Sequence, residues 1–434
     1  MQTPQNPLFG WTVGQWLTAY QNGELALNAL RDLRQAYPAQ DNAWISLVSL
    51  TQLDVQLAEL SQRLDAAKGD LSQFPLYGVP FAIKDNIDAA DWLTTAACPE
   101  FGYTASADAT VVARLRAAGA ILMGKTNLDQ FATGLVGTRS PFGAVSNSFD
   151  PDYVSGGSSS GSASVVARGL VAFSLGTDTA GSGRVPAGFN NIVGLKPTKG
   201  RLSNTGLVPA CRTVDCISIF ALTVEDAEQV ASIAEGYDAS DAYSRRNPNT
   251  APVGFGQSLK LAVPDTLEFF GDAQNQAVYE RALLTLSKMG AELTRIDFAP
   301  FKALAEQLYY GSWVAERTVA LESMLEANPD AINPVVRGIV ENGLGYSACD
   351  AYKAEYLRAT LSRQINDALA GFDALVVPTS ATLRTLAEMA EEPVMYNSQF
   401  GFYTNFTNLA DLSALALPAG LRACGRTAYQ RASP

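Results

Sequence analysis

The sequence predicts an α/β fold, with a large, mixed and mostly parallel β-sheet sandwiched between helices and a helical segment before it. From residue 75 onward, short apolar runs of strand length alternate with helical patterns, which is typical of strands joined by crossover helices. The first 70 residues show helical periodicity instead. The chain has 434 residues, 47% of them hydrophobic and 17% charged, so it can bury a sizeable core.

The first part of the chain is expected to be helical and to carry no chemistry. Leucines and aromatic residues recur at helical spacing between residues 12 and 66. Thr12 is a candidate N-cap of the first helix, and Asn22-Gly23 is a candidate stop signal. We therefore divide the chain into an N-terminal helical segment, 1–70, and a larger domain, 71–434.

Strands and helices alternate through the larger domain. The apolar runs predict strands at 77–83, 120–123, 171–175, 217–222, 259–264 and 374–378. The helical patterns between them predict helices at 109–119, 160–168, 274–289 and 300–326. This order favours a single α/β domain without an internal repeat.

Composition and charge exclude several kinds of function. The net charge of −12 argues against a nucleic-acid partner, because no basic excess is present to neutralise phosphates. No run of about 18 apolar residues predicts a membrane span, and the first residues lack the pattern of a secretory signal. Five scattered cysteines match no common zinc spacing, and we expect free thiols in the cytoplasm.

The chain has no histidine, which excludes a Ser-His-Asp or Cys-His enzyme and any histidine-ligated metal site built from this chain alone. If the protein is an acid–base enzyme, its base must be a lysine, aspartate, glutamate, tyrosine or cysteine.

A glycine- and serine-rich run covers residues 155–164. Such a run on its own is typical of a flexible linker, and the Gly-Lys-Ser/Thr ending of a phosphate-binding loop is missing. The run leads directly into an apolar helix, which weakens the linker interpretation. A glycine-rich turn that opens a buried helix offers backbone N–H groups to an anion or an oxyanion.

Two further features could carry chemistry. Small residues at 176–183 follow a predicted strand, where Ser182 is either a nucleophile with adjacent free amides or a solvated serine in a tight turn. Lys84 ends another predicted strand. Such a lysine usually reaches the surface, but a buried lysine can lose its proton and act as a base.

These features together resemble the amidase signature family. Five short motifs follow one another in family order between about residues 70 and 220, at 84–86, 125–127, 156–162, 178–182 and 194–198. The resemblance implies the amidase signature fold for the larger domain. It also implies an amide hydrolase that uses no metal and no cofactor.

The resemblance implies a catalytic triad of Lys84, Ser158 and Ser182. Ser182 would attack the amide carbonyl, Ser158 would pass on its proton, and Lys84 would be the terminal base. A cis peptide bond from Gly157 would precede Ser158. The oxyanion hole would consist of the backbone amides of Thr179, Ala180, Gly181 and Ser182. Four neighbouring residues are expected to be structural, namely Ser159, Ser160, Asp178 and Arg184.

Local variants are similar to the allophanate hydrolase branch of this family. Ala180 stands where many amidases carry glycine, and the stretches 208–216 and 308–317 also fit that branch. The resemblance implies that Tyr309 and Arg317 orient a substrate carboxylate from one face of a helix. The alternative is a packing tyrosine and a surface arginine. Gly134 would add a backbone hydrogen bond to the substrate.

The expected reaction is the cleavage of allophanate (urea-1-carboxylate) to ammonia and N-carboxycarbamate through an acyl-enzyme, and the expected assembly is a homodimer. Three alternatives stay open: a carboxybiuret hydrolase, a non-catalytic scaffold of the same fold and a glutamine-dependent amidotransferase subunit. After residues 417–420 the sequence departs from the allophanate hydrolase pattern. We therefore expect a truncated or altered C-terminal end.

Overall fold

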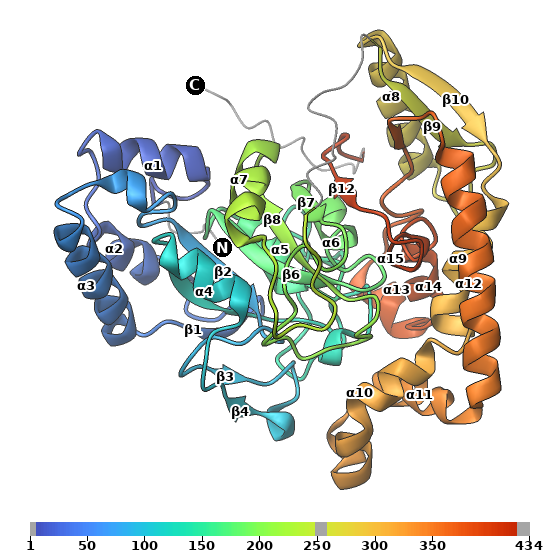
Figure 1. Cartoon of the computed structure of the whole chain (residues 1–434), viewed down its shortest axis with the longest axis horizontal. Helices are drawn as coiled ribbons and strands as arrows, with labels where there is room; N and C mark the ends of the chain where they lie inside the picture. The colour runs from blue at the N-terminus through green and yellow to red at the C-terminus, as the bar shows by residue number, and fades with distance from the viewer. Residues whose placement is uncertain (1–5, 248–257, 423–434) are drawn as a thin grey trace.

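The centre of the molecule is a seven-stranded sheet in the order β1-β5-β2-β6-β8-β7-β12, seen in a computed structural model that describes residues 6–247 and 258–422 (Figure 1). The strands are β1 (Trp44–Leu47), β2 (Pro80–Lys84), β5 (Ile121–Thr126), β6 (Phe173–Asp178), β7 (Val193–Lys196), β8 (Cys216–Ala221) and β12 (Ala414–Ala416). Parallel pairs join β5, β2 and β6 at the centre, and antiparallel pairs complete both sides. The predicted mixed α/β sheet is confirmed.

The N-terminal segment contains helices α1 (Val13–Gln21), α2 (Ala29–Gln35) and α3 (Leu50–Ala66), as the periodicity predicts. Thr12 caps α1, because its hydroxyl accepts a hydrogen bond from the Gln15 backbone N–H at 3.1 Å. The segment is not purely helical, however, since β1 lies within it and pairs antiparallel with β5. A strand of four residues is too short for its periodicity to show in the sequence. The division of the chain at residue 70 stays a prediction.

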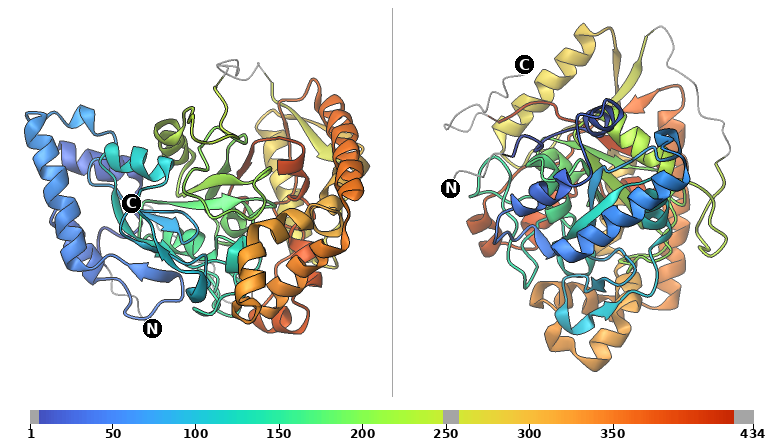
Figure 2. Two further views of the ribbon diagram at one scale, coloured as in Figure 1. Left: turned by 60° about the horizontal axis from the view of Figure 1, so that its bottom comes forward. Right: turned by 90° about the vertical axis from the view of Figure 1, so that its left-hand side faces the viewer.

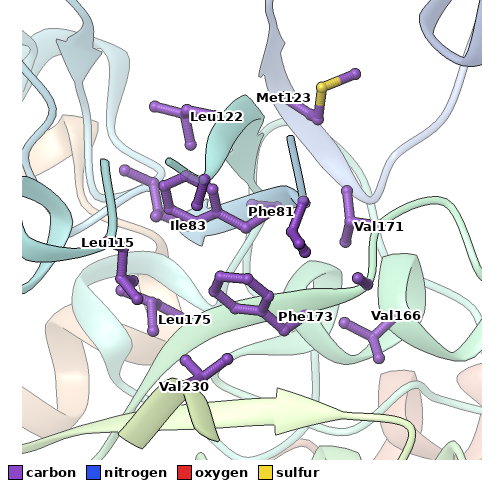
Figure 3. Packing of buried hydrophobic residues seen from close by; sticks show 14 of the residues in the cluster. Phe81, Ile83, Leu115, Leu122, Met123, Val166, Val171, Phe173, Leu175 and Val230 are labelled. Atoms are coloured by element: carbon purple, nitrogen blue, oxygen red, sulfur yellow. The ribbon is translucent and has the colours of Figure 1, made fainter. Parts of the chain in front are cut away.

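Helices α4 (Thr110–Ala117), α5 (Ser160–Ala167) and α7 (Val224–Ala234) are among those that contribute to the core of the main sheet. Phe81 on β2 and Phe173 on β6 stack with ring centroids 5.3 Å apart. Leu115, Val166 and Val230, one from each helix, surround these rings (Figure 3). Burial of one such side chain contributes about 1.5–3 kcal/mol, so this core holds the strand ends, and the residues on them, in fixed positions.

A second, three-stranded parallel sheet has the order β10-β9-β11, with β9 (Lys260–Pro264), β10 (Glu292–Ile296) and β11 (Ala374–Leu375). Helices α8 (Ala273–Lys288) and α12 (Ala348–Leu369) belong to the same part of the molecule. They lie at the end opposite to α1–α3 in both Figure 1 and Figure 2. The buried strand predicted at 374–378 is wrong in length and burial, because β11 has two residues at the edge of this small sheet and Ala374 is exposed.

The single helix predicted at 300–326 is two helices, α9 (Ala299–Tyr310) and α10 (Val314–Ala327). Gly311 ends α9 in an extended conformation, with φ −115° and ψ −177°. A Cβ at Gly311 would lie 2.6 Å from the carbonyl oxygen of Gln307, so a larger residue would crowd the break. Tyr309 and Arg317 therefore do not share one helix face, and that expectation is wrong.

The remaining elements are short and connect these parts. They are α6 (Val185–Phe189), α11 (Pro334–Glu341), α13 (Leu386–Glu391), α14 (Met395–Phe400), α15 (Phe406–Leu409), the strand pair β3 (Leu93–Thr94) and β4 (Tyr103–Thr104), and 3-10 turns at Leu71–Gln73, Pro99–Phe101, Gln130–Ala132, Pro329–Ala331 and Asn342–Gly345. None of the helices within 6–247 and 258–422 has the length and apolar character needed to cross a bilayer. The unusual stretch after residue 422 lies outside the described residues.

Candidate active site

Lys84 is the last residue of β2 and is completely buried. Its Nζ atom lies 2.7 Å from Ser158 Oγ and 2.7 Å from Thr177 Oγ1. Thr177 comes from the neighbouring parallel strand β6, so two strand ends converge on one amine. Ser159 bonds instead to the Thr177 carbonyl oxygen, at 3.1 Å, as expected of a structural residue.

The environment of Lys84 favours its neutral form. Burial is the main cause and lowers the pKa of Lys84 to about 7, because a charged amine loses hydration in the protein interior. Three carboxylates, those of Asp129, Asp215 and Asp178, oppose this shift, while Arg317 adds to it. At neutral pH a substantial fraction of the amine is therefore free to accept a proton.

Ser158 follows a cis peptide bond from Gly157, as predicted. Its carbonyl oxygen accepts a hydrogen bond from the backbone N–H of Asp129 at 3.1 Å. The buried carboxylate of Asp129 accepts hydrogen bonds from the backbone N–H groups of 136–139. Asp129 was not among the residues predicted from the sequence, yet it joins this loop to the backbone of Ser158.

Ser182 lies in the turn between β6 and α6 and is buried, with 2% of its surface exposed. The backbone N–H groups of Thr179, Ala180, Gly181 and Ser182 donate to no described residue, which leaves four adjacent buried donors for a ligand oxygen. The Ser182 hydroxyl likewise has no hydrogen bond to any described residue, Ser158 included. The structure thus joins Lys84 to Ser158 directly, and it places Ser182 in a separate turn.

A buried ion pair fixes this turn. Arg184 Nε donates to Asp178 Oδ2 at 2.8 Å, and Arg184 Nη2 donates to Asp178 Oδ1 at 2.9 Å. Arg184 also bonds to Thr407 and Asn408 on α15. Burial opposes ionisation of Asp178, but the Arg184 charge and hydrogen bonds outweigh it, so the pKa of Asp178 is lowered. Both residues were expected to be structural, and these contacts are of that kind.

Asp215 supports the same turn from the other side. Its carboxylate accepts a hydrogen bond of 2.5 Å from Thr179 Oγ1, and the backbone N–H groups of Ala210 and Cys211 donate to it at 2.9 and 3.0 Å. Burial raises the pKa of Asp215 to about 6, and these hydrogen bonds oppose the shift. The sequence shows Asp215 only within a stretch similar to allophanate hydrolase. Its contact with Thr179, 36 residues away, is not visible there.

Arg317 and Tyr309 meet although a helix break separates them. The Arg317 Cζ atom lies 5.3 Å from the centre of the Tyr309 ring. Arg317 is 1% exposed, and its Nη1 donates to Thr133 Oγ1 at 3.1 Å. Its Nε and Nη2 are buried without a hydrogen-bond partner among the described residues. Two unpaired donors on one guanidinium match the two oxygens of a carboxylate.

Tyr309 lies against this guanidinium, and Gly134 follows Thr133, the hydrogen-bond partner of Arg317, in the chain. Tyr309 lines an open pocket of about 360 Å³ together with Tyr310, Val314, Asn342, Gly345 and Tyr346, whereas Lys84 and the two serines are buried outside its lining. Gly134 has φ +156°, and its backbone N–H and carbonyl groups bond to no described residue.

Within the described ranges no group of acidic or cysteine side chains could hold a metal ion.

Known proteins share this sequence and fold. Urea amidolyase of Saccharomyces cerevisiae is 47% identical over 421 residues, which are 95% of this chain but 23% of that protein. The solved structure of Kluyveromyces lactis allophanate hydrolase matches with a TM-score of 0.92 and 45% identity, over 96% of this chain and 69% of that chain. A glutamyl-tRNA(Gln) amidotransferase subunit of Symbiobacterium thermophilum is 36% identical over 431 residues, covering 92% of this chain and 86% of that protein.

The chain spans less than a quarter of the length of the two urea amidolyases that it matches. A sequence model of the amidase family matches residues 29–427, which is most of the chain. The chain therefore belongs to the amidase family, as its motifs predict.

Proposed function

We propose that this chain hydrolyses allophanate with a triad of Lys84, Ser158 and Ser182. The observation that carries the proposal is the fully buried Lys84 amine, hydrogen-bonded to Ser158 and with a pKa of about 7, in a chain that has no histidine. This amine can act as the general base, a role that the imidazole of a histidine has in other serine hydrolases.

In the proposed reaction Ser182 Oγ attacks the ureido carbonyl carbon of allophanate. Its proton passes to Ser158 Oγ, and the proton of Ser158 passes to Lys84 Nζ. The same path then returns a proton to the nitrogen that leaves as ammonia. Water next attacks the acyl-enzyme ester, releases N-carboxycarbamate and restores the Ser182 hydroxyl, and N-carboxycarbamate loses carbon dioxide.

The free N–H groups of 179–182 would bind the oxyanion in both steps. One such donor lowers the barrier by roughly 2.7–4 kcal/mol. No step in this scheme requires a metal or an organic cofactor.

The carboxylate of the substrate is assigned to Arg317. The unpaired Nε and Nη2 atoms of Arg317 can donate two parallel hydrogen bonds to it, with the Tyr309 ring against the guanidinium and the free backbone groups of Gly134 nearby. The names of the relatives, urea amidolyase and allophanate hydrolase, support this choice of substrate. We propose amide cleavage alone for this chain.

Ammonia release from allophanate, biuret derivatives, glutamine and simple aliphatic amides tests the proposal. Allophanate should be cleaved best, and Arg317→Gln should lose this activity while a fluorophosphonate probe still labels Ser182. Ser182→Ala should lose both. A wild-type preference for glutamine would instead favour an amidotransferase, and no labelling of the folded protein would favour a scaffold.

Two further expectations belong to this proposal. A reducing compartment, the cytoplasm, suits the free thiols of Cys98, Cys211, Cys216 and Cys349. A homodimer is the expected assembly, and light scattering of the purified chain measures it directly.

A further inference from the structure

We infer that Arg139 is a specificity-determining residue, which acts with Arg317 to restrict the site to amides that carry an anionic group. The inference rests on the proposed function, because it concerns the same substrate site. Arg139 acts on the substrate through Thr133 and through its charge, and so is a positioning residue.

Arg139 is an internal arginine whose guanidinium group forms no ion pair with a described carboxylate, although its backbone N–H donates to Asp129. It is 2% exposed, its Nη1 donates to the Thr133 carbonyl oxygen at 3.0 Å, and its Nη2 donates to the Pro393 carbonyl oxygen at 2.6 Å. Its Nε atom is buried without a hydrogen-bond partner in the same part of the chain. Backbone carbonyls thus satisfy part of this guanidinium, but no described carboxylate forms an ion pair with it.

Thr133 connects Arg139 to Arg317. The carbonyl oxygen of Thr133 accepts from Arg139, and its hydroxyl accepts from Arg317. Two buried guanidinium groups therefore lie on either side of one residue, and three of their nitrogen atoms lack partners among the described residues. A buried charge without a counter-ion is unfavourable, so this arrangement favours an anion in the site.

The carboxylates whose charges affect these two arginines already accept hydrogen bonds from other groups. Asp129, Asp215 and Glu316 each accept hydrogen bonds from backbone N–H or hydroxyl groups. None of the three forms an ion pair with Arg139 or Arg317 within the described parts of the chain. The charges of these carboxylates stabilise the two guanidinium groups from a distance, but no described carboxylate pairs with either of them directly. The carboxylate of the substrate is the anion that the proposed reaction supplies for such a direct pair.

The electrostatics of Arg139 agree with this geometry. Its pKa is lowered, chiefly by burial, and the charge of Arg317 acts in the same direction, while Asp129 and Tyr309 oppose the shift. The charges of the two guanidinium groups thus repel each other. An anion bound to Arg317 relieves this repulsion, whereas a neutral amide of the same shape does not.

The test compares allophanate with biuret, in which a neutral carboxamide replaces the carboxylate. Biuret is measured as a substrate or, if it is not cleaved, as a competitive inhibitor. Arg139→Gln should raise the KM for allophanate by roughly 10- to 100-fold. It should leave kcat for allophanate and the KM or inhibition constant of biuret nearly unchanged. Arg139→Lys, which keeps the charge, should restore most of the preference for allophanate.

Arg114→Gln is the matched control. Arg114 also donates to backbone carbonyl oxygens, those of Ala234 and Gly236, but it lies on α4 away from the site. The Arg114→Gln variant should leave unchanged the ratio between the KM for allophanate and the KM or inhibition constant of biuret. If Arg139→Gln melts below the assay temperature, Arg139→Met removes the same charge and keeps an apolar stem.

Two outcomes overturn the inference. One is an equal loss of allophanate and biuret binding in Arg139→Gln, and the other is a loss in Arg139→Lys as large as in Arg139→Gln. Both would assign a structural role to Arg139. A wild-type protein that does not cleave allophanate contradicts the proposed function instead, so the two failures are distinguishable.

Discussion

Lys84 Nζ and Ser158 Oγ lie 2.7 Å apart at the carboxyl end of β2, where both side chains are fully buried. The neighbouring parallel strand β6 ends with Thr177 and Asp178, so its carboxyl end opens at the same edge of the sheet. Ligands of open α/β sheets bind at such carboxyl ends. Here that edge supplies the amine, its hydroxyl partners and the turn that contains Ser182.

The rate of amide hydrolysis should rise as the pH increases through about 7. Only the neutral amine of Lys84 can accept a proton, and its pKa is lowered to about 7, mainly by burial. The measurement is kcat/KM against pH, which reports groups of the free enzyme. Lys84→Arg should lose roughly 10²- to 10⁴-fold in activity, because its guanidinium stays protonated. A flat profile from about pH 6 to pH 9 would contradict Lys84 as the base.

Lys84→Met should stabilise the protein, and more so at low pH. The ordinary pKa of 10.5 applies to the unfolded chain and about 7 to the folded one. Between these values the unfolded state binds more protons, so the stability of the wild type rises with pH. The gain from Lys84→Met should therefore shrink by on the order of 2 kcal/mol from about pH 6 to pH 9. Thermal melts of the wild type and the variant across this pH range measure the gain. Lys260→Met, at an exposed lysine, is the control and should show no such trend.

The short motifs of the sequence predict candidate site residues that are close together in the structure. Lys84 follows a predicted apolar strand, and Ser158 follows the two glycines of a glycine- and serine-rich run. The structure brings these two side chains together. Thr177, Asp129 and Asp215 are ordinary residue types, and their roles come from contacts with segments distant in the sequence. Contacts between distant segments cannot be predicted from the local periodicity of the sequence.

The pairing of Tyr309 with Arg317 is predicted from the resemblance to allophanate hydrolase, and only the expectation of a shared helix face is wrong. Their spacing of eight fits one face of a continuous helix, but Gly311 ends α9 between them. They still meet, because the chain turns at residues 311–313 and α10 brings Arg317 back against the Tyr309 ring. A short strand such as β1 is missed for a related reason, since its role depends on pairing with β5 and not on its own sequence.

Asp215→Asn should lower kcat more than it raises KM. The carboxylate accepts from Thr179 Oγ1 and from the backbone N–H of Cys211, and an amide in its place turns one acceptor into a donor that faces a donor. The Thr179 turn then loses its support, and unpaired buried groups destabilise the fold by about 1–3 kcal/mol. Steady-state kinetics and melting of Asp215→Asn check this, and wild-type kcat would show that the turn holds without Asp215.

Arg184→Met should destabilise the protein far more than a surface arginine substitution. The Asp178–Arg184 pair is buried and bidentate, with N–O distances of 2.8 and 2.9 Å. Removing Arg184 leaves the Asp178 charge buried without its partner. Such a change lowers the free energy of unfolding by about 3–5 kcal/mol. Arg31→Met, which breaks an exposed pair with Asp54, is the control and should have little effect, because solvent screens that pair.

The double variant Asp178→Asn/Arg184→Met separates the two parts of this effect. With Asp178 neutral, no buried charge is left without a partner, so the double variant should be more stable than Arg184→Met alone. It should still be inactive, because the turn that ends at Ser182 loses its attachment to α15 through Thr407 and Asn408. Urea unfolding and fluorophosphonate labelling of Ser182 measure the two effects separately. A double variant that is less stable than Arg184→Met would mean that hydrogen bonds, and not the unpaired charge, dominate at this site.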